Sequence, residues 1–89
     1  MSIRCRCLLA REGRQPVWSD KDLRLPPRAG DSVQFDDGGE VASFRIDEVM
    51  HTPALDGVDF ALILTELPGT RGKPFREIFE EAARTGPTR

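Results

Sequence analysis

The stretch that decides the fold is RLPPRAGDSVQFDDGGEVASF, residues 24–44. Its two prolines, Pro26 and Pro27, lack backbone donors and favour extended structure before them, so they belong at a sheet edge or in a connection. Gly30 permits a positive φ, and the Asp31 carboxylate can accept hydrogen bonds from nearby amides, which is turn chemistry. Alternating residues follow, and DDGGE (residues 36–40) is a strong hairpin signal, because a type I′ turn needs positive φ at both central positions. The stretch therefore predicts the entry into a strand and a tight hairpin, not a catalytic motif.

Alternation predicts a strand over residues 2–10, upstream of this hairpin. Ile3, Cys5, Cys7 and Leu9 share one face, and the intervening arginines share the other, as in a half-buried strand with arginines outward. Residues 11–22 are polar and contain Gly13 and Pro16, so we expect a loop or wide hairpin there. Trp18, on this loop, either folds back on the core or serves as an exposed anchor.

Two more strands are predicted downstream. Residues 41–50 alternate until Asp47 and Glu48, where the pattern slips as it does at a β-bulge. Residues 58–67 are apolar on both faces, with Ile63 opposite the main set, which predicts a central strand covered on both sides.

The cover is expected from a C-terminal helix over residues 74–84. Pro74 suits a first helical turn, and an apolar stripe follows with the spacing i, i+3, i+4 and i+7, formed by Phe75, Ile78, Phe79 and Ala82. Gly86 and Pro87 stop the helix. The alternative is that Phe75 and Phe79 face a second copy or a partner. Residues 85–89 are expected to be a mobile tail.

Together these elements predict a mainly-β (α+β) domain over residues 1–84, a partly open antiparallel barrel of about five strands with one C-terminal helix. The pieces Pro27, Gly30, Asp31 and Val33 resemble the strand entry of small SH3-like barrels, including KOW-type domains, over about residues 25–67. KOW domains carry a further Gly-x-x-Gly-x-Val element, and DDGGEVASF stands in its place here. The resemblance implies an SH3-like fold and an interaction role. The acidic character of this segment departs from the basic loops with which KOW domains bind RNA.

Composition limits the class of protein. Eighty-nine residues suit one domain with a small core, and a hydrophobic share of 38% with a charged share of 31% fits a globular chain. The longest apolar run near the start, CLLA, is too short for a signal peptide, so we expect a cytoplasmic protein that does not enter a membrane. The use of 11 Arg against 2 Lys, without Tyr or Asn, indicates a GC-rich bacterial or phage genome.

Charge is unevenly distributed along the chain. The net charge is +4 over residues 1–30, −8 over residues 31–69 and +2 over residues 70–89. Either the segments neutralise one another in the fold, or the domain presents an acidic face to a basic partner. The predicted partner-binding residues are Trp18, Asp36, Asp37, Glu40, Asp47 and Glu48.

The leading hypothesis is a non-enzymatic protein-interaction module, a monomer or homodimer without a cofactor, in the manner of a small phage or bacterial inhibitor or adaptor. One alternative is a nucleic-acid-associated protein, since arginine suits phosphate. Its contacts would come from the N-terminal arginines, chiefly Arg4, Arg6, Arg11 and Arg14, with Arg24 and Arg28 nearby. The pI of about 5.3 opposes this alternative.

A second alternative is a metal or thiol site. Cys5, Cys7 and His51 could converge, with Asp47 or Asp56 as an oxygen ligand, but a Cys-x-Cys pair with one distant His falls short of the usual zinc spacing. Two buried, reduced core thiols are the simpler interpretation. The carboxylate pairs near turns could in principle act as acid and base, although exposed turn residues are commonly solvated.

Overall fold

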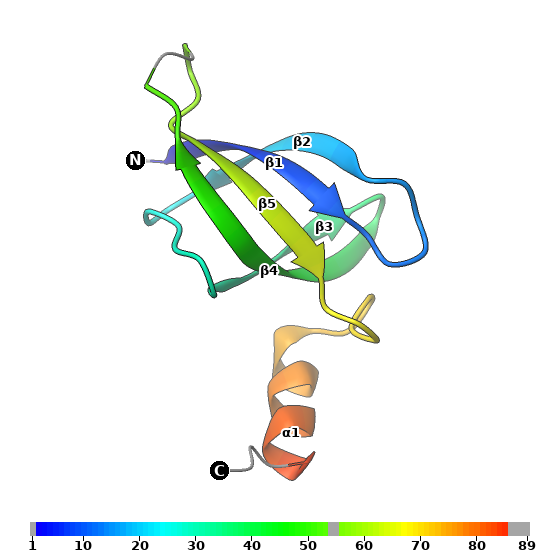
Figure 1. Cartoon of the computed structure of the whole chain (residues 1–89). Helices are drawn as coiled ribbons and strands as arrows, with labels where there is room; N and C mark the ends of the chain where they lie inside the picture. The colour runs from blue at the N-terminus through cyan, green and yellow to red at the C-terminus, as the bar shows by residue number, and fades with distance from the viewer. Residues whose placement is uncertain (1, 54–55, 86–89) are drawn as a thin grey trace.

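The computed structural model describes residues 2–53 and 56–85 (Figure 1). It contains five strands and one helix, which confirms the mainly-β, partly open barrel with a C-terminal helix. The elements are β1 (Ile3–Ala10), β2 (Val17–Leu23), β3 (Ser32–Asp37), β4 (Glu40–His51), β5 (Phe60–Glu66) and α1 (Phe75–Thr85).

The strands form one curled sheet in the order β2-β1-β5-β4-β3. β5 is the central strand, as expected. Three of the strand pairs are antiparallel, but β1 and β5 run parallel, so the sheet is mixed and the all-antiparallel expectation was wrong for this pair. Alternation in a sequence shows where a strand lies and which face it buries. It carries no information on the direction of a neighbour more than 50 residues away.

The turns follow the glycines of the opening stretch. Gly38 and Gly39 have φ of 68° and 91° and connect β3 to β4 at the Asp37–Glu40 pair, as a two-residue hairpin requires. Gly30 has φ of 94°, and its amide donates to the Ile46 carbonyl at 2.8 Å. The bulge is confirmed, since the register of β4 against β5 shifts between Ile46 and Glu48.

The core occupies the inner face of the curled sheet. Phe44 is fully buried and stacks on Phe35 with ring centroids 5.1 Å apart. Lys21 of the edge strand β2 places its Nζ 4.5 Å from the Phe35 ring centroid on the other edge strand, β3, so a cation–π contact spans the open side of the barrel. The other buried apolar residues of the cluster are Cys5, Cys7, Leu9, Ala42, Ile46, Leu62 and Leu64.

The hairpin expected over residues 11–22 is present, but its loop is shorter than predicted. Residues 17–23 form the edge strand β2, because Val17, Lys21 and Leu23 alternate inward although the segment is polar overall. The expected position of the helix was wrong. α1 does not cover the sheet but stands beyond one end of the barrel (Figure 1). The outer face of β5 is therefore uncovered, and Ile63 is 41% exposed.

The C-terminal helix α1 ends close to the predicted position. α1 extends to Thr85, one residue beyond the predicted end, and the rest of the predicted mobile tail, 86–89, lies outside the described residues. None of the helices in the described part of the chain is long and apolar enough to cross a membrane.

The central role of Phe44 is testable by truncation. Phe44→Ala removes a fully buried ring that stacks on Phe35, and the cavity left behind should lower the free energy of unfolding by about 3–5 kcal/mol. Urea denaturation followed by circular dichroism measures this loss. Val41→Ala, an exposed position on the same strand, is the matched control and should cost well under 1 kcal/mol.

Candidate interaction surface

The outer face of the sheet carries an apolar patch that crosses four strands. One row of paired residues runs Trp18 on β2, Leu8 on β1, Ile63 on β5 and Glu48 on β4. Trp18 is 65% exposed, so its side chain points to solvent and does not cap the core. We call Trp18, Leu8, Ile63, Ala61 and Met50 the outer patch.

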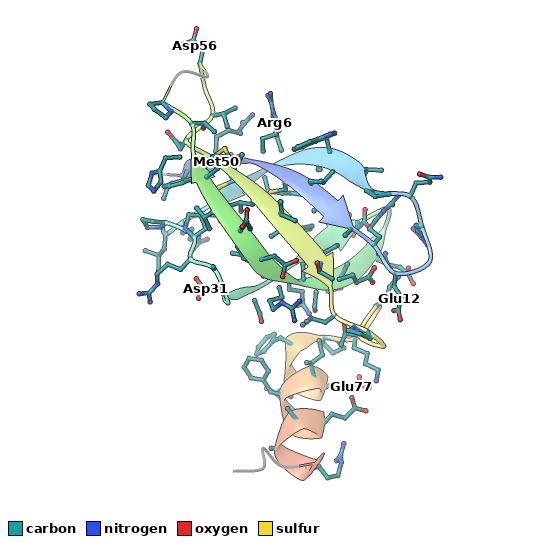
Figure 2. The ribbon with its side chains drawn as sticks, in the orientation of Figure 1. Arg6, Glu12, Asp31, Met50, Asp56 and Glu77 are labelled. Atoms are coloured by element: carbon teal, nitrogen blue, oxygen red, sulfur yellow. The ribbon has the colours of Figure 1, made fainter. Side chains whose placement is uncertain are left out.

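A second row borders the first and extends the outer patch toward the N-terminal end of β1. It runs Asp20, Arg6, Ala61 and Met50 across the same four strands. Met50 is 62% exposed, and Figure 2 shows it and Arg6 near the same end of the sheet. A shallow hollow of about 190 Å³ opens between Trp18, Met50 and Ile63. Clustered exposed apolar side chains at the outward positions of adjacent strands are typical of a contact surface, because single exposed apolar residues are normally scattered.

The arginines predicted to contact nucleic acid face acidic residues of β2. Arg6 Nε lies 3.1 Å from Asp20 Oδ1, and Arg4 Nε lies 2.8 Å from Asp22 Oδ1. The hydrogen bond from Arg6, aided by its charge, lowers the pKa of Asp20. The positive charge of this strand is therefore offset locally. Arg11 is largely buried near Asp37, and Arg14 is exposed in the β1–β2 turn.

The residues predicted to form one acidic face are divided among different environments. Asp47 accepts hydrogen bonds from the Thr65 hydroxyl and, at 2.9 Å, from Arg45 Nε, and these contacts lower its pKa. Asp36 is exposed on the outer side of β3. Glu48 is exposed at the border of the outer patch, and within the described residues it has no ion-pair partner.

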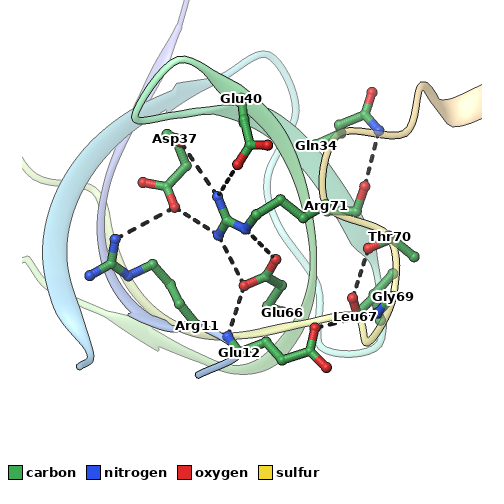
Figure 3. A network of polar contacts seen from close by, with 11 residues as sticks. Arg11, Glu12, Gln34, Asp37, Glu40, Glu66, Leu67, Gly69, Thr70 and Arg71 are labelled. Carbon is green, nitrogen blue, oxygen red and sulfur yellow. Dashed lines mark hydrogen bonds and ion pairs between the residues drawn. The ribbon is translucent and has the colours of Figure 1, made fainter. Parts of the chain in front are cut away.

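Asp37 and Glu40 belong to a charged cluster that the sequence reasoning missed (Figure 3). Its centre is Arg71, whose Nε lies 2.9 Å from Glu66 Oε2 and whose Nη2 lies 3.0 Å from Asp37 Oδ2. Glu40 Oε1 is 3.7 Å from Arg71 Nη1, and the Glu12 amide donates to Glu66 Oε1 at 2.8 Å. The sequence did contain a signal for the burial of Glu66. This residue follows Leu62 and Leu64 at a spacing of two, so it falls on the inward face of β5.

Burial and pairing act in opposite directions on Glu66, whose side chain is fully buried. Burial raises the pKa of Glu66, but hydrogen bonds from Arg71 and the Glu12 amide, with the charge of Arg71, outweigh it and hold that pKa below its ordinary value. Hydrogen bonds to Glu66 and Asp37 likewise raise the pKa of Arg71. The cluster is a stable set of ion pairs that closes this end of the barrel.

The thiols and the histidine do not meet. Cys5 and Cys7 face the core as free thiols, and Phe60 lies between Cys5 and His51 in the strand register. The His51 ring contacts Phe60 edge-on, with centroids 5.0 Å apart. Burial, followed by the charge of Cys5, raises the pKa of the Cys7 thiol to about 12. The described residues contain no group of three or more His, Cys, Asp or Glu side chains arranged to hold a metal ion.

No protein-family model matches the chain, and searches of curated proteins and of solved structures return no significant match.

Replacing Arg71 should reverse the effect of acid on stability. In the wild type, Glu66 has a lowered pKa, so its contribution is present above the ordinary value of 4.5 and is lost as pH falls through the folded-state pKa. Arg71→Met leaves a buried carboxylate without its cation and should cost about 3–5 kcal/mol at pH 7. In Arg71→Met, burial is no longer outweighed by the arginine, so the pKa of Glu66 should rise above its ordinary value.

The deficit of Arg71→Met relative to wild type should therefore shrink as pH falls from about 7 to 4, as read from urea midpoints. Arg45→Met, at an exposed pair, is the control and should show a small deficit. A deficit for Arg71→Met that stays constant with pH would show that Glu66 is not the group concerned.

The buried thiols should be unreactive in the folded protein. Because only thiolate attacks a disulfide reagent, Cys5 and Cys7 should react with Ellman's reagent at neutral pH only at the rate of unfolding, and both should react at once in denaturant. Rapid labelling of the native protein at an unchanged unfolding rate would contradict the inward orientation.

Proposed function

We propose that this protein is a non-enzymatic interaction module that binds a protein partner through the outer patch, with Trp18 as its anchor. The observation that carries the proposal is the apolar outer patch, which spans β2, β1, β5 and β4 and exposes Trp18, Ile63 and Met50 to solvent. Tryptophan is strongly enriched among the residues that dominate binding energy. A small adaptor or inhibitor fits this arrangement, because the outer patch is open to one partner. The assignment to the SH3-like class remains a prediction.

The chemistry of the partner follows from the border of the outer patch. Glu48 ends the row that begins at Trp18, and it is the predicted acidic residue placed beside the apolar surface. Asp37, Glu40 and Asp47 are each paired with an arginine of the same domain and contribute less to attraction. The expected partner therefore presents apolar side chains flanked by a lysine or arginine that faces Glu48. Local pairing of Arg4 and Arg6 makes nucleic acid the weaker hypothesis.

A patch variant tests the proposal. The tagged wild type and Ile63→Asp are used to capture partners from lysate, with and without nuclease, and the recovered partner is then titrated as a purified protein. Ile63→Asp should weaken the affinity by at least about tenfold, since an acidic group would be buried in the contact. Glu48→Lys should weaken it further by repulsion.

Leu25→Asp is the control, because Leu25 is also an exposed aliphatic residue, 77% exposed against 41% for Ile63, but lies in the β2–β3 connection. It should retain wild-type affinity. A partner that binds Ile63→Asp and wild type equally would refute the outer patch as its site, and capture lost on nuclease treatment would favour nucleic acid.

A further inference from the structure

α1 carries a second apolar surface that its own domain leaves open. Phe75 and Phe79 are 61% and 68% exposed, and their rings meet edge-on with centroids 6.0 Å apart. We call Phe75, Ile78, Phe79 and Ala82 the α1 stripe. An apolar groove of about 150 Å³ opens between this stripe and the outer side of β3 and β4, where Gln34, Ser43 and Leu67 form its other wall.

The segment before α1 is fixed to the end of the barrel. The Gly72 amide donates to the Val41 carbonyl at 2.8 Å, and Gln34 Nε2 donates to the Lys73 carbonyl at 3.2 Å. Arg71, the residue before Gly72, is held by its ion pairs with Glu66 and Asp37. α1 therefore starts beside β3 and β4, and it could reach the outer patch of its own chain only by breaking these bonds. Within the described residues, the outer patch and the α1 stripe therefore do not cover each other in one chain.

The outer patch and the helix are of comparable size. The row from Trp18 to Ile63 crosses three strands about 4.8 Å apart, so it is about 10 Å wide. The α1 stripe runs over eight residues, Phe75 to Ala82, and its seven rises of about 1.5 Å extend about 10 Å along the helix. A helix about 10 Å in diameter lying along β1 and β5 would cover the row from Trp18 to Ile63. The groove beside the α1 stripe is open to solvent and lined largely by apolar side chains, so an aromatic side chain of a second molecule can enter it from outside. Trp18, the single tryptophan, is the exposed aromatic side chain of the outer patch.

Their borders match in charge. Helical geometry places Arg76 beside Phe79 on one border of the α1 stripe and Glu81, which pairs with Lys73, on the opposite border. Glu48 occupies the β4 border of the outer patch. Neither Arg76 nor Glu48 has an ion-pair partner among the described residues. Seating Arg76 over Glu48 places the Ile78 border, with its groove, on the side where Trp18 lies.

We propose that the chain self-associates, with the outer patch of one copy against the α1 stripe of a second copy, Trp18 in the groove, and Arg76 facing Glu48. This inference rests on the proposed function, because it names the occupant of the same outer patch. In a closed two-fold dimer every such contact occurs twice. That doubling brings a small helix-on-sheet contact toward the area of about 1,000 Å² that a specific interface needs.

Sedimentation equilibrium and tryptophan fluorescence of the full chain test the proposal. The wild type should be a dimer whose Trp18 emission shifts to shorter wavelength as concentration rises, because the indole moves into an apolar groove. Phe79→Ala and Trp18→Ala should each raise the dimer dissociation constant by about 30-fold, as expected for interface hot spots. Leu25→Ala, an exposed position outside both surfaces, should leave it unchanged.

A charge exchange tests the register. Glu48→Arg and Arg76→Glu should each weaken the dimer by about fivefold, and the double variant should restore it. Both positions are exposed, so folding should be retained. A chain that is monomeric at all concentrations, a dimer unaffected by Trp18→Ala or Phe79→Ala, or a double variant no tighter than the singles would overturn the proposal.

The test of self-association can be distinguished from the test of the proposed function. Phe79→Asp alters the α1 stripe and leaves the outer patch intact. A monomeric wild type whose lysate partner is lost with Ile63→Asp but retained with Phe79→Asp overturns self-association and supports the outer patch as a site for a different protein. A dimer that follows the predicted variants, without a patch-dependent lysate partner, supports self-association alone.

Discussion

The ion pair between Arg71 and Glu66 determines where the connection after β5, and with it the start of α1, lies relative to the sheet. Glu66 is the last residue of the central strand β5, and its side chain is buried on the inner face of the sheet. A buried charge is tolerated only when it is paired and hydrogen-bonded. Arg71 supplies that partner from the connection after β5, so the connection must fold back across the barrel end. The place where α1 begins follows from this constraint, as does the separation of its apolar stripe from the sheet.

A curled sheet of five strands has one inner face, and this chain fills it with aliphatic side chains, two thiols and the stacked rings of Phe44 and Phe35. In the described part of the chain no second layer covers the outer patch, so its apolar residues remain in contact with water. A short domain buries a smaller fraction of its surface than a long one, so exposed apolar residues form a large part of what it presents. This arrangement also explains why the function proposed here is located on strands and a helix instead of in a deep pocket, and why the thiols, which face inward, have no part in it.

Local patterns predicted much of the architecture. The glycines of the hairpin, the slip at Asp47, the inward cysteines and the amphipathic C-terminal helix each appear in the structure where the sequence placed them. Features that depend on distant partners were not predictable in this way. The parallel β1–β5 pair joins segments 50 residues apart in the sequence. Trp18 lies in a strand because its segment forms backbone hydrogen bonds with β1. The pairing of Asp37 and Glu40 with Arg71 was not predictable for the same reason, since Arg71 lies more than 30 residues further along the chain.

The contact of Lys21 with Phe35 has a consequence for how the chain avoids unwanted assembly. β2 and β3 are the two free edges of the sheet, and an unpaired edge is a template for strand addition and fibril growth. Lys21 points inward from one edge and covers the aromatic ring of the other with a charge. An incoming strand would have to displace or bury that ammonium group. The seam of the half-barrel is thereby protected against edge-to-edge aggregation, even though the chain exposes apolar side chains on its face.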